Sequence, residues 1–166
     1  VADAGRAFAA GGWLVLLGGA ADIFDGRIAR ARGIASRAGA FLDSTLDRFA
    51  ETFAYVGLVA CFRASWWEVL LVALAMGGSL LVSYARARGE GLGVQYKGGL
   101  MQRAERLVLL ALASLLDPVL SRGAGWPHGR LLLLTIGFIG IASLATAFHR
   151  TVAIARTLER EESPRG

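Results

Sequence analysis

The sequence predicts an all-α integral membrane protein, a helical bundle with five visible transmembrane helices. Hydrophobic residues make up 55% of the 166 residues, charged residues make up 19%, and the mean hydropathy is +0.52. This composition lies outside the range that is usual for soluble domains. Five apolar stretches approach the length of about 20 residues that a helix needs to cross a bilayer. They are residues 7–24, 41–62, 66–85, 104–120 and 130–153.

The first predicted helix, residues 7–24, is short and rich in glycine. Small residues allow the backbones of two membrane helices to approach closely, and van der Waals packing then holds them together. Glycines in the later helices are interpreted in the same way, so the sequence predicts a compact bundle. The glycines concerned are Gly11, Gly12, Gly18, Gly19, Gly57, Gly77, Gly78, Gly137 and Gly140.

The third predicted helix begins at two tryptophans, Trp66 and Trp67. Tryptophan is enriched where a helix leaves the hydrocarbon, so this pair is typical of a membrane interface. The sequence contains no repeat and no low-complexity segment that would mark a second domain. We therefore assign residues 1–155 to one membrane domain and residues 156–166 to a polar cytoplasmic tail.

Basic residues are concentrated in alternate connections between the predicted helices. The connections 26–39 and 86–103 and the tail are rich in arginine, whereas the other connections contain few basic residues. Cytoplasmic loops of membrane proteins carry an excess of Lys and Arg, so these three segments are predicted to face the cytoplasm. The net charge of +5 is therefore attributed to topology and phosphate binding, and no nucleic-acid partner is expected.

Four aspartates lie where the first two predicted helices meet the cytoplasmic side. Asp22 and Asp25 are three residues apart, Asp43 and Asp47 are four apart, and each pair therefore shares one helix face. An ionised aspartate costs about 2.5–3.5 kcal/mol at the centre of a bilayer helix, so the cluster needs compensating charge. About two divalent cations would supply it. Oxygen-only ligands favour Mg²⁺, Mn²⁺ or Ca²⁺ over zinc.

Glycine and arginine beside the aspartates indicate that the site binds a phosphorylated ligand. Gly26 and Gly39 would let such a ligand lie against the backbone, and Arg30 could bind a phosphate oxygen. Two metals with an arginine suit phosphoryl or phosphatidyl transfer, in which charge neutralisation and alignment do most of the catalysis. Any one aspartate alone would be interpreted as a helix cap or a surface ion pair. The joint pattern favours the metal site.

The pattern Asp22-x-x-Asp25-Gly26-x-x-Ala29-Arg30-x8-Gly39-x-x-x-Asp43-x-x-x-Asp47 resembles the signature of the CDP-alcohol phosphotransferases, also called CDP-alcohol phosphatidyltransferases. Every signature position is filled. The resemblance implies six helices, the first of which is not visible here, and a homodimer. The chain begins at Val1, so we expect an N-terminal truncation.

The same resemblance implies the roles of the signature residues. Two metals, for which we expect Mg²⁺ with Mn²⁺ as the alternative, would bind the pyrophosphate of a CDP-linked lipid. Asp47 would also be the general base that deprotonates the acceptor alcohol, and CMP would be released. The metal ligands would be Asp22, Asp25, Asp43 and Asp47, and the CDP pocket would be shaped by Gly26, Ala29, Arg30 and Gly39.

Three further arginines, Arg86, Arg106 and Arg150, fall at cytoplasmic helix ends and could converge on an acidic group beside the metals. The stretches around them resemble the branch of the family that makes phosphatidylinositol phosphate, or its archaeal ether-lipid counterpart, from inositol phosphate. There, three basic residues hold the acceptor phosphate; the first is often Lys, and this chain has Arg86. Inositol phosphate is therefore the expected acceptor, and glycerol 3-phosphate is the nearest alternative.

Several alternatives stay open from the sequence. The arginines could follow from topology alone, and Glu90 and Glu105 could simply pair with them. Glu51 continues the Asp43–Asp47 stripe by one turn, either as a group supporting the site or as a polar residue facing the bundle interior. His149 contacts substrate or is a passive interfacial residue. A cation transporter or channel lined by the same carboxylates is the alternative from a different functional class.

Overall fold

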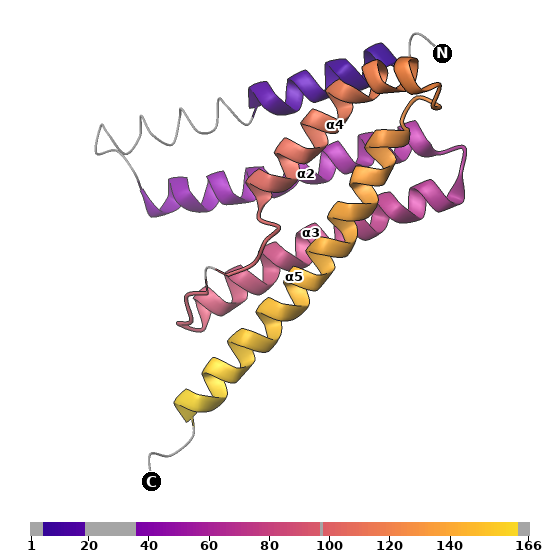
Figure 1. The fold of residues 1–166 in the computed structure, drawn as a ribbon. Coiled ribbons are helices and arrows are strands. Elements are labelled where there is room, and N and C mark those ends of the chain that lie inside the picture. Colours follow the sequence, from indigo (N-terminus) through magenta and orange to yellow (C-terminus); the bar gives the residue numbers. More distant parts are fainter. Residues whose placement is uncertain (1–4, 19–35, 97, 163–166) are drawn as a thin grey trace.

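The computed structural model describes residues 5–18, 36–96 and 98–162, and these residues form helices and their connections, without strands (Figure 1). The all-α prediction is confirmed. A helix lies at each of the five predicted positions, although residues 19–24 of the first prediction lie outside the described ranges. The helices are Gly5–Gly18, α2 (Arg37–Phe62), α3 (Trp66–Gly91), α4 (Arg103–Ala124) and α5 (Arg130–Glu162).

Three of the described helices, α3, α4 and α5, are long and apolar enough to cross a membrane. α2 has 26 residues, which is also long enough, but its segment from Arg37 to Glu51 contains Asp43, Asp47, Arg48 and Glu51. Its outward face is nevertheless apolar, as shown by Phe53, which is 69% exposed. Such exposed large hydrophobic side chains occur on every described helix, as expected when lipid covers the outside of a bundle.

α3 and α5 lie side by side, and small residues bring them together (Figure 1). A Cβ atom added at Gly78 would lie 3.0 Å from the Cβ of Ser143 and 3.3 Å from the carbonyl oxygen of Gly140. A Cβ atom added at Gly12 would likewise lie 3.0 Å from the carbonyl oxygen of Ala111 in α4. The predicted glycine packing therefore holds at these positions.

Other glycines do not mediate close packing among the described residues. Added Cβ atoms at Gly11, Gly18, Gly57 and Gly77 would meet no described atom within 4 Å. The described residues therefore give no support to the packing prediction at these four positions, and it stays a prediction there. A Cβ atom added at Gly137 would lie at ordinary contact distance, 4.0 Å from the Leu71 Cδ2.

The apolar core lies where α2, α3, α4 and α5 meet. Tyr55, Val72, Leu132 and Ile136 are completely buried there. The Tyr55 hydroxyl lies 3.0 Å from the Ser79 Oγ, so the polar end of this buried ring has a hydrogen-bond partner. This core fixes the spacing of the four helices relative to one another.

The connection from α4 to α5 is closed by a buried carboxylate. α4 continues past Pro118 to Ala124, and the next helix begins at Arg130. Asp117 is completely buried and accepts hydrogen bonds from the backbone N–H of Gly129 at 2.6 Å and of Leu131 at 2.9 Å. The carboxylate thus satisfies donors at the start of α5 that have no partner within the helix.

Residues 156–162 of the predicted tail continue α5 as helix, and residues 163–166 lie outside the described ranges. The connection between α3 and α4 is held by Gly99, which has φ +121 and lies directly against Thr146 of α5. A side chain at this position would be strained and would also overlap Thr146. The connection therefore runs close to α5, beside Arg150.

Candidate active site

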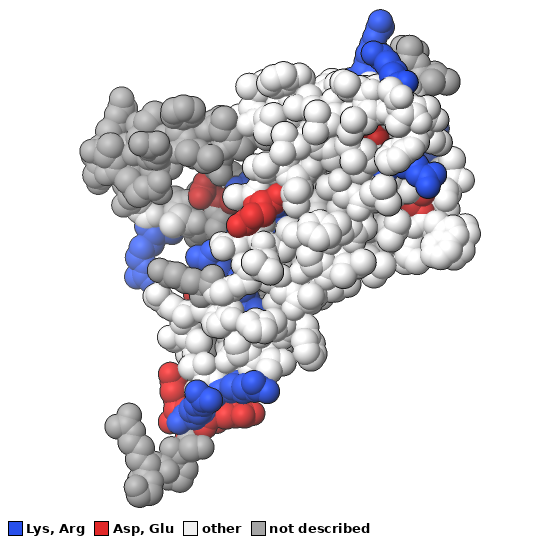
Figure 2. Space-filling model, in the orientation of Figure 1, with Lys and Arg blue, Asp and Glu red and all other residues white. Residues whose placement is uncertain are grey.

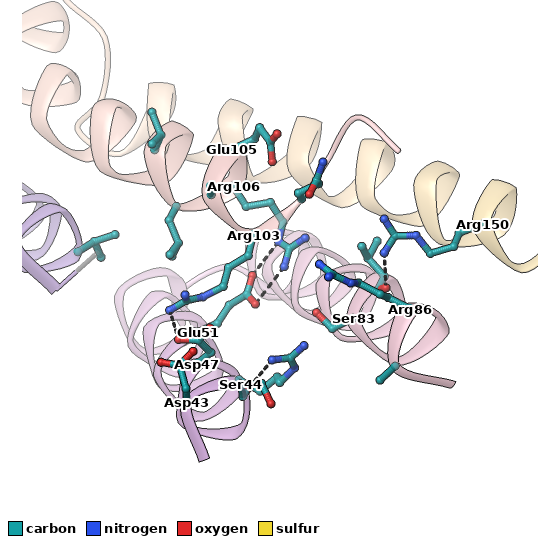
Figure 3. Close-up of a pocket in the computed structure, with 18 of the residues that line it drawn as sticks. Asp43, Ser44, Asp47, Glu51, Ser83, Arg86, Arg103, Glu105, Arg106 and Arg150 are labelled. Carbon is teal, nitrogen blue, oxygen red and sulfur yellow. Dashed lines mark hydrogen bonds and ion pairs between the residues drawn. The ribbon is translucent and has the colours of Figure 1, made fainter. Parts of the chain in front are cut away.

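A cavity of about 690 Å³ opens between α2, α3, α4 and α5 (Figure 3). Its wall is unusually rich in charge for a bundle whose visible surface is mostly uncharged (Figure 2). Carboxylates and guanidinium groups are mixed in this wall, so anionic and cationic partners could both be bound there. The charged lining residues are Asp43, Asp47, Glu51, Glu90, Glu105, Arg48, Arg86, Arg103, Arg106 and Arg150.

The acidic side of the cavity is one stripe on α2. Ser36 caps this helix by accepting the backbone N–H of Gly39 at 3.0 Å, which places the start of α2 just before the carboxylates. Asp43, Asp47 and Glu51 then follow at intervals of one turn on the same face. Along this stripe Asp43 is exposed, Asp47 is half-buried and Glu51 is only 3% exposed.

Two arginines of α4 face this stripe and pair with it (Figure 3). The Arg103 Nη2 lies 2.7 Å from the Asp47 Oδ1. One turn deeper, Arg106 donates from Nε to the Glu51 Oε1 at 2.7 Å and from Nη2 to the Glu51 Oε2 at 3.0 Å. Arg103 and Arg106 are three residues apart and so lie on one face of α4, as Asp47 and Glu51, four residues apart, lie on one face of α2.

The three arginines predicted to bind the acceptor phosphate all line the cavity, but in different surroundings. Arg106 is completely buried, and its Nη1 also donates to the Met101 carbonyl at 2.8 Å. Arg150 is 3% exposed and donates to the carbonyls of Val82 and Gly98. Arg86 has an exposed side chain. The structure therefore brings the three together while giving two of them firm support from the protein.

The other half of the predicted metal site cannot be placed. Asp22, Asp25, Gly26, Ala29 and Arg30 all lie outside the described residues. Within residues 5–18, 36–96 and 98–162, no group of three or more His, Cys, Asp or Glu side chains is positioned to hold a metal ion. The predicted roles of the signature residues stay predictions.

Asp43 and Asp47 nevertheless fit a divalent cation. They are one turn apart, both border the cavity and both offer only oxygen, the donor that Mg²⁺ and Mn²⁺ prefer. The guanidinium of Arg103 at 2.7 Å from Asp47 shows that a positive charge is already accommodated beside this carboxylate. Asp43 and Asp47 would form part of the ligand set, and the chemistry supplied would be neutralisation of phosphate charge.

Two residues left open by the sequence now have partners. The Glu90 Oε1 lies 2.8 Å from the Arg86 Nε, so Glu90 pairs with a neighbouring arginine. The His149 Nδ1 lies 3.2 Å from the Tyr96 hydroxyl, which joins α5 to the α3–α4 connection. Arg103 was not among the predicted site residues, although its three-residue spacing from Arg106 was a usable signal.

A second cavity of about 590 Å³ lies between the helix Gly5–Gly18, α2 and α4. Most of its lining is apolar, and it includes Phe8, Phe53 and Leu107. Asp47 and Arg103 line this cavity as well as the charged one. An apolar space and a charged space therefore meet at the Asp47–Arg103 pair.

Comparison with known proteins finds similarity to one family along almost the whole chain. The protein-family model described as CDP-alcohol phosphatidyltransferase matches residues 3–154. The chain is 36% identical over 154 residues to a phosphatidylinositol phosphate synthase of Cutibacterium acnes, covering 90% of this chain and 74% of that protein. It is 38% identical over 105 residues to an archaetidylinositol phosphate synthase of Methanothermobacter thermautotrophicus, covering 63% of this chain and 52% of that protein.

A solved structure has the same fold. The crystal structure of Mycobacterium tuberculosis phosphatidylinositol phosphate synthase with CDP-DAG bound matches with a TM-score of 0.75 and 27% identity, over 92% of this chain and 79% of that one. The structure of the same enzyme in complex with manganese and citrate also matches with a TM-score of 0.75. The predicted resemblance is therefore confirmed, and this integral membrane protein belongs to the CDP-alcohol phosphatidyltransferase family.

Proposed function

We propose that this protein transfers a phosphatidyl group, or its ether-lipid counterpart, from a CDP-linked lipid to a hydroxyl of inositol phosphate and releases CMP. The observation that carries the proposal is the charged cavity, where the α2 carboxylates face arginines contributed by α3, α4 and α5. Relatives named phosphatidylinositol phosphate synthase and archaetidylinositol phosphate synthase support this acceptor. The first is an ester-lipid name and the second an ether-lipid name, so both donors belong in the test.

The donor would bind at the α2 side of the cavity. We propose that two divalent cations, Mg²⁺ or Mn²⁺, neutralise the pyrophosphate of the CDP-lipid there. The manganese complex of the Mycobacterium tuberculosis enzyme supports the use of a divalent metal. The proposed ligands are Asp22, Asp25, Asp43 and Asp47, and the proposed CDP pocket is formed by Gly26, Ala29, Arg30 and Gly39.

The lipid part of the donor would lie in the apolar cavity. This cavity meets the charged one at Asp47 and Arg103. A lipid could therefore place its charged head in one cavity and its apolar chains in the other. Burial of hydrocarbon chains beside Phe53 and Leu107 would hold the pyrophosphate next to the carboxylates. The CDP-DAG complex of the related enzyme supports a CDP-lipid as the donor.

Asp47 is the proposed general base. The acceptor hydroxyl would give its proton to the Asp47 carboxylate while its oxygen forms a bond to the phosphorus that carries the lipid. The bond from that phosphorus to the bridging pyrophosphate oxygen would break, and CMP would leave with the electron pair. Arg103, at 2.7 Å from the Asp47 Oδ1, orients this carboxylate toward the cavity.

Arg86, Arg106 and Arg150 would bind the acceptor phosphate. A guanidinium has five N–H donors, and the hydrogen bonds of Arg106 to Glu51 and Met101 use three of them. Arg150 uses two on backbone carbonyls, and its buried Nε has no hydrogen-bond partner among the described residues. Donors therefore remain on both side chains, and the more exposed Arg86 adds a third positive charge to the cavity wall.

The arginine-rich connections support a cytoplasmic orientation of this active site. We also propose a homodimer, as the family resemblance implies. Protease accessibility in inverted vesicles tests the orientation, and analytical ultracentrifugation in detergent tests the dimer. A monomer, or an active site reached only from the outside, would contradict these two proposals.

An acceptor panel tests the proposed function. Purified protein is incubated with CDP-diacylglycerol or its ether analogue, Mg²⁺, and either inositol phosphate, glycerol 3-phosphate, inositol or serine, and CMP release is measured. We expect release with inositol phosphate and little with the acceptors that lack phosphate. Release only with glycerol 3-phosphate would replace the acceptor. No release with any acceptor would favour the transporter or channel alternative, which cation flux into proteoliposomes then tests.

A further inference from the structure

The ion pair between Glu51 and Arg106 is the most enclosed polar contact of the site. The side chain of Glu51 is 4% exposed and that of Arg106 is 0% exposed. Both carboxylate oxygens are engaged, at 2.7 Å and 3.0 Å, in the two-pronged geometry that suits a guanidinium. In Figure 3 two dashed lines join Glu51 on α2 to Arg106 on α4, beside the Arg103–Asp47 pair.

The hydrogen bonds determine the orientation of the guanidinium plane. Glu51 binds the edge formed by Nε and Nη2, while the Met101 carbonyl accepts from Nη1 at 2.8 Å. A long flexible side chain is thereby restricted to one geometry, which reduces the entropy lost when a ligand binds. Each terminal nitrogen keeps one uncommitted N–H. Arg106 lines the cavity, so these two donors would be the ones offered to an anion that reaches this buried guanidinium.

We propose that Glu51 is a positioning residue of the acceptor site: its bidentate contact orients Arg106 for the acceptor phosphate. The inference rests on the proposed function, in which Arg106 binds that phosphate. It assigns Glu51 a role distinct from that of Asp43 and Asp47, although the three form one stripe. In the proposed function the first two carboxylates would bind the metals, whereas both oxygens of Glu51 are engaged by Arg106.

Two opposite effects make the inference testable. The negative charge of Glu51 opposes an incoming phosphate, so a purely electrostatic role predicts that Glu51→Gln tightens acceptor binding. A positioning role predicts the reverse. A neutral amide offers one acceptor oxygen in place of two, and a buried arginine left without its carboxylate will turn toward another partner. The sign of the change in KM separates the two effects.

A simple structural brace between α2 and α4 is the other explanation. Removal of such a brace would lower the stability of the protein, and it would not raise the KM for one substrate more than the KM for the other. The closing experiment therefore measures KM for inositol phosphate and for CDP-diacylglycerol, together with the unfolding temperature, in the full chain. The variants are Glu51→Gln, Glu51→Asp, Arg106→Gln and the Glu51→Gln/Arg106→Gln double variant.

Glu51→Gln should raise the KM for inositol phosphate about tenfold or more, the cost of losing a charge-assisted hydrogen bond. The KM for the donor should stay within about twofold. Glu51→Asp keeps the charge but withdraws it by one methylene group, so it should resemble Glu51→Gln. In the Arg106→Gln background, Glu51→Gln should have no further effect on the acceptor KM, because its only route is through Arg106.

Glu90→Gln is the matched control. Glu90 also pairs with a proposed acceptor arginine, Arg86, but the two side chains are 47% and 53% exposed. Exposed pairs contribute little, so the acceptor KM should change by about twofold or less. A change as large as that of Glu51→Gln would show that burial and bidentate geometry are irrelevant, and would overturn the inference.

Three further results would overturn it: a lower acceptor KM in Glu51→Gln, wild-type behaviour of Glu51→Asp, or an undiminished effect of Glu51→Gln in the Arg106→Gln background. If Glu51→Gln does not fold, the inference is tested by Glu51→Asp and by comparing the double variant with Arg106→Gln. If the wild-type protein releases no CMP, the proposed function fails. Calorimetric titration with inositol phosphate then tests the inference without turnover. The inference requires that Glu51→Asp binds inositol phosphate more weakly than the wild type does.

Discussion

Gly78→Ala is expected to destabilise the bundle, whereas Gly77→Ala, one residue earlier on the same helix, should not. The added Cβ at Gly78 would lie 3.0 Å from the Ser143 Cβ, 3.2 Å from the backbone nitrogen of Leu144 and 3.3 Å from the Gly140 carbonyl oxygen. Two of these neighbours are backbone atoms, so relief requires α3 and α5 to move apart. The same addition at Gly77 meets no described atom within 4 Å.

The two variants share one favourable effect and differ in one unfavourable effect. Replacing glycine with alanine inside a helix gains about 0.8–1 kcal/mol in helix propensity at either position. Overpacking at a close contact costs about 1–3 kcal/mol, and only Gly78→Ala should incur it. The difference between the two variants thus isolates the clash, and Gly77→Ala should be as stable as the wild type or slightly more stable.

The assay is thermal unfolding of the two purified variants in the same detergent. About 2–4 °C of Tm accompanies each kcal/mol in a chain of this size, so Gly78→Ala should unfold roughly 2–12 °C below Gly77→Ala. Equal midpoints for the two variants would refute the reasoning. That result would mean that α3 and α5 are not in backbone contact at Gly78, or that they separate without cost.

Three other results are expected. Asp47→Asn should abolish CMP release while circular dichroism still reports a helical bundle, and near-normal turnover would exclude Asp47 as the base. Asp117→Ala should lower the unfolding free energy by at least about 1–3 kcal/mol, because the backbone N–H groups of Gly129 and Leu131 lose their acceptor. The acceptor KM should not change, since Asp117 lies about 21 Å along α4 from Arg103. EDTA should stop CMP release and added Mg²⁺ or Mn²⁺ should restore it; turnover that survives chelation would contradict a metal-dependent site.

Much of the fold could be predicted from local patterns. Helix positions follow from the length of apolar stretches, which depends only on neighbouring residues, and the structure has a helix at each position. Glycine packing was predictable only in part. Gly78 and Gly12 meet a neighbouring helix, while Gly57 and Gly77 meet no described atom. The rotation of a helix about its own axis decides which of its glycines face a neighbouring helix. That rotation depends on the packing of the whole bundle.

In the candidate site, too, some features could be predicted from local patterns and others depended on the whole bundle. The spacing of Asp43 and Asp47 placed them on one helix face, and both line the cavity. The three predicted arginines line it as well. No local pattern, however, indicated that Arg106 would be buried against Glu51 or that Arg103 would pair with Asp47. These pairs join residues more than 50 positions apart, so they depend on where α4 lies relative to α2.

The sequence by itself therefore determined the class of this protein, its family and the carboxylate stripe. Each of these is encoded in short-range composition and spacing, to which a helix of 3.6 residues per turn gives a definite geometry. Only the tertiary structure decided which charges are partners: Asp47 with Arg103, and Glu51 with Arg106. The physical reason is that an ion pair requires its groups within about 4 Å, a distance that helix packing, rather than sequence spacing, establishes.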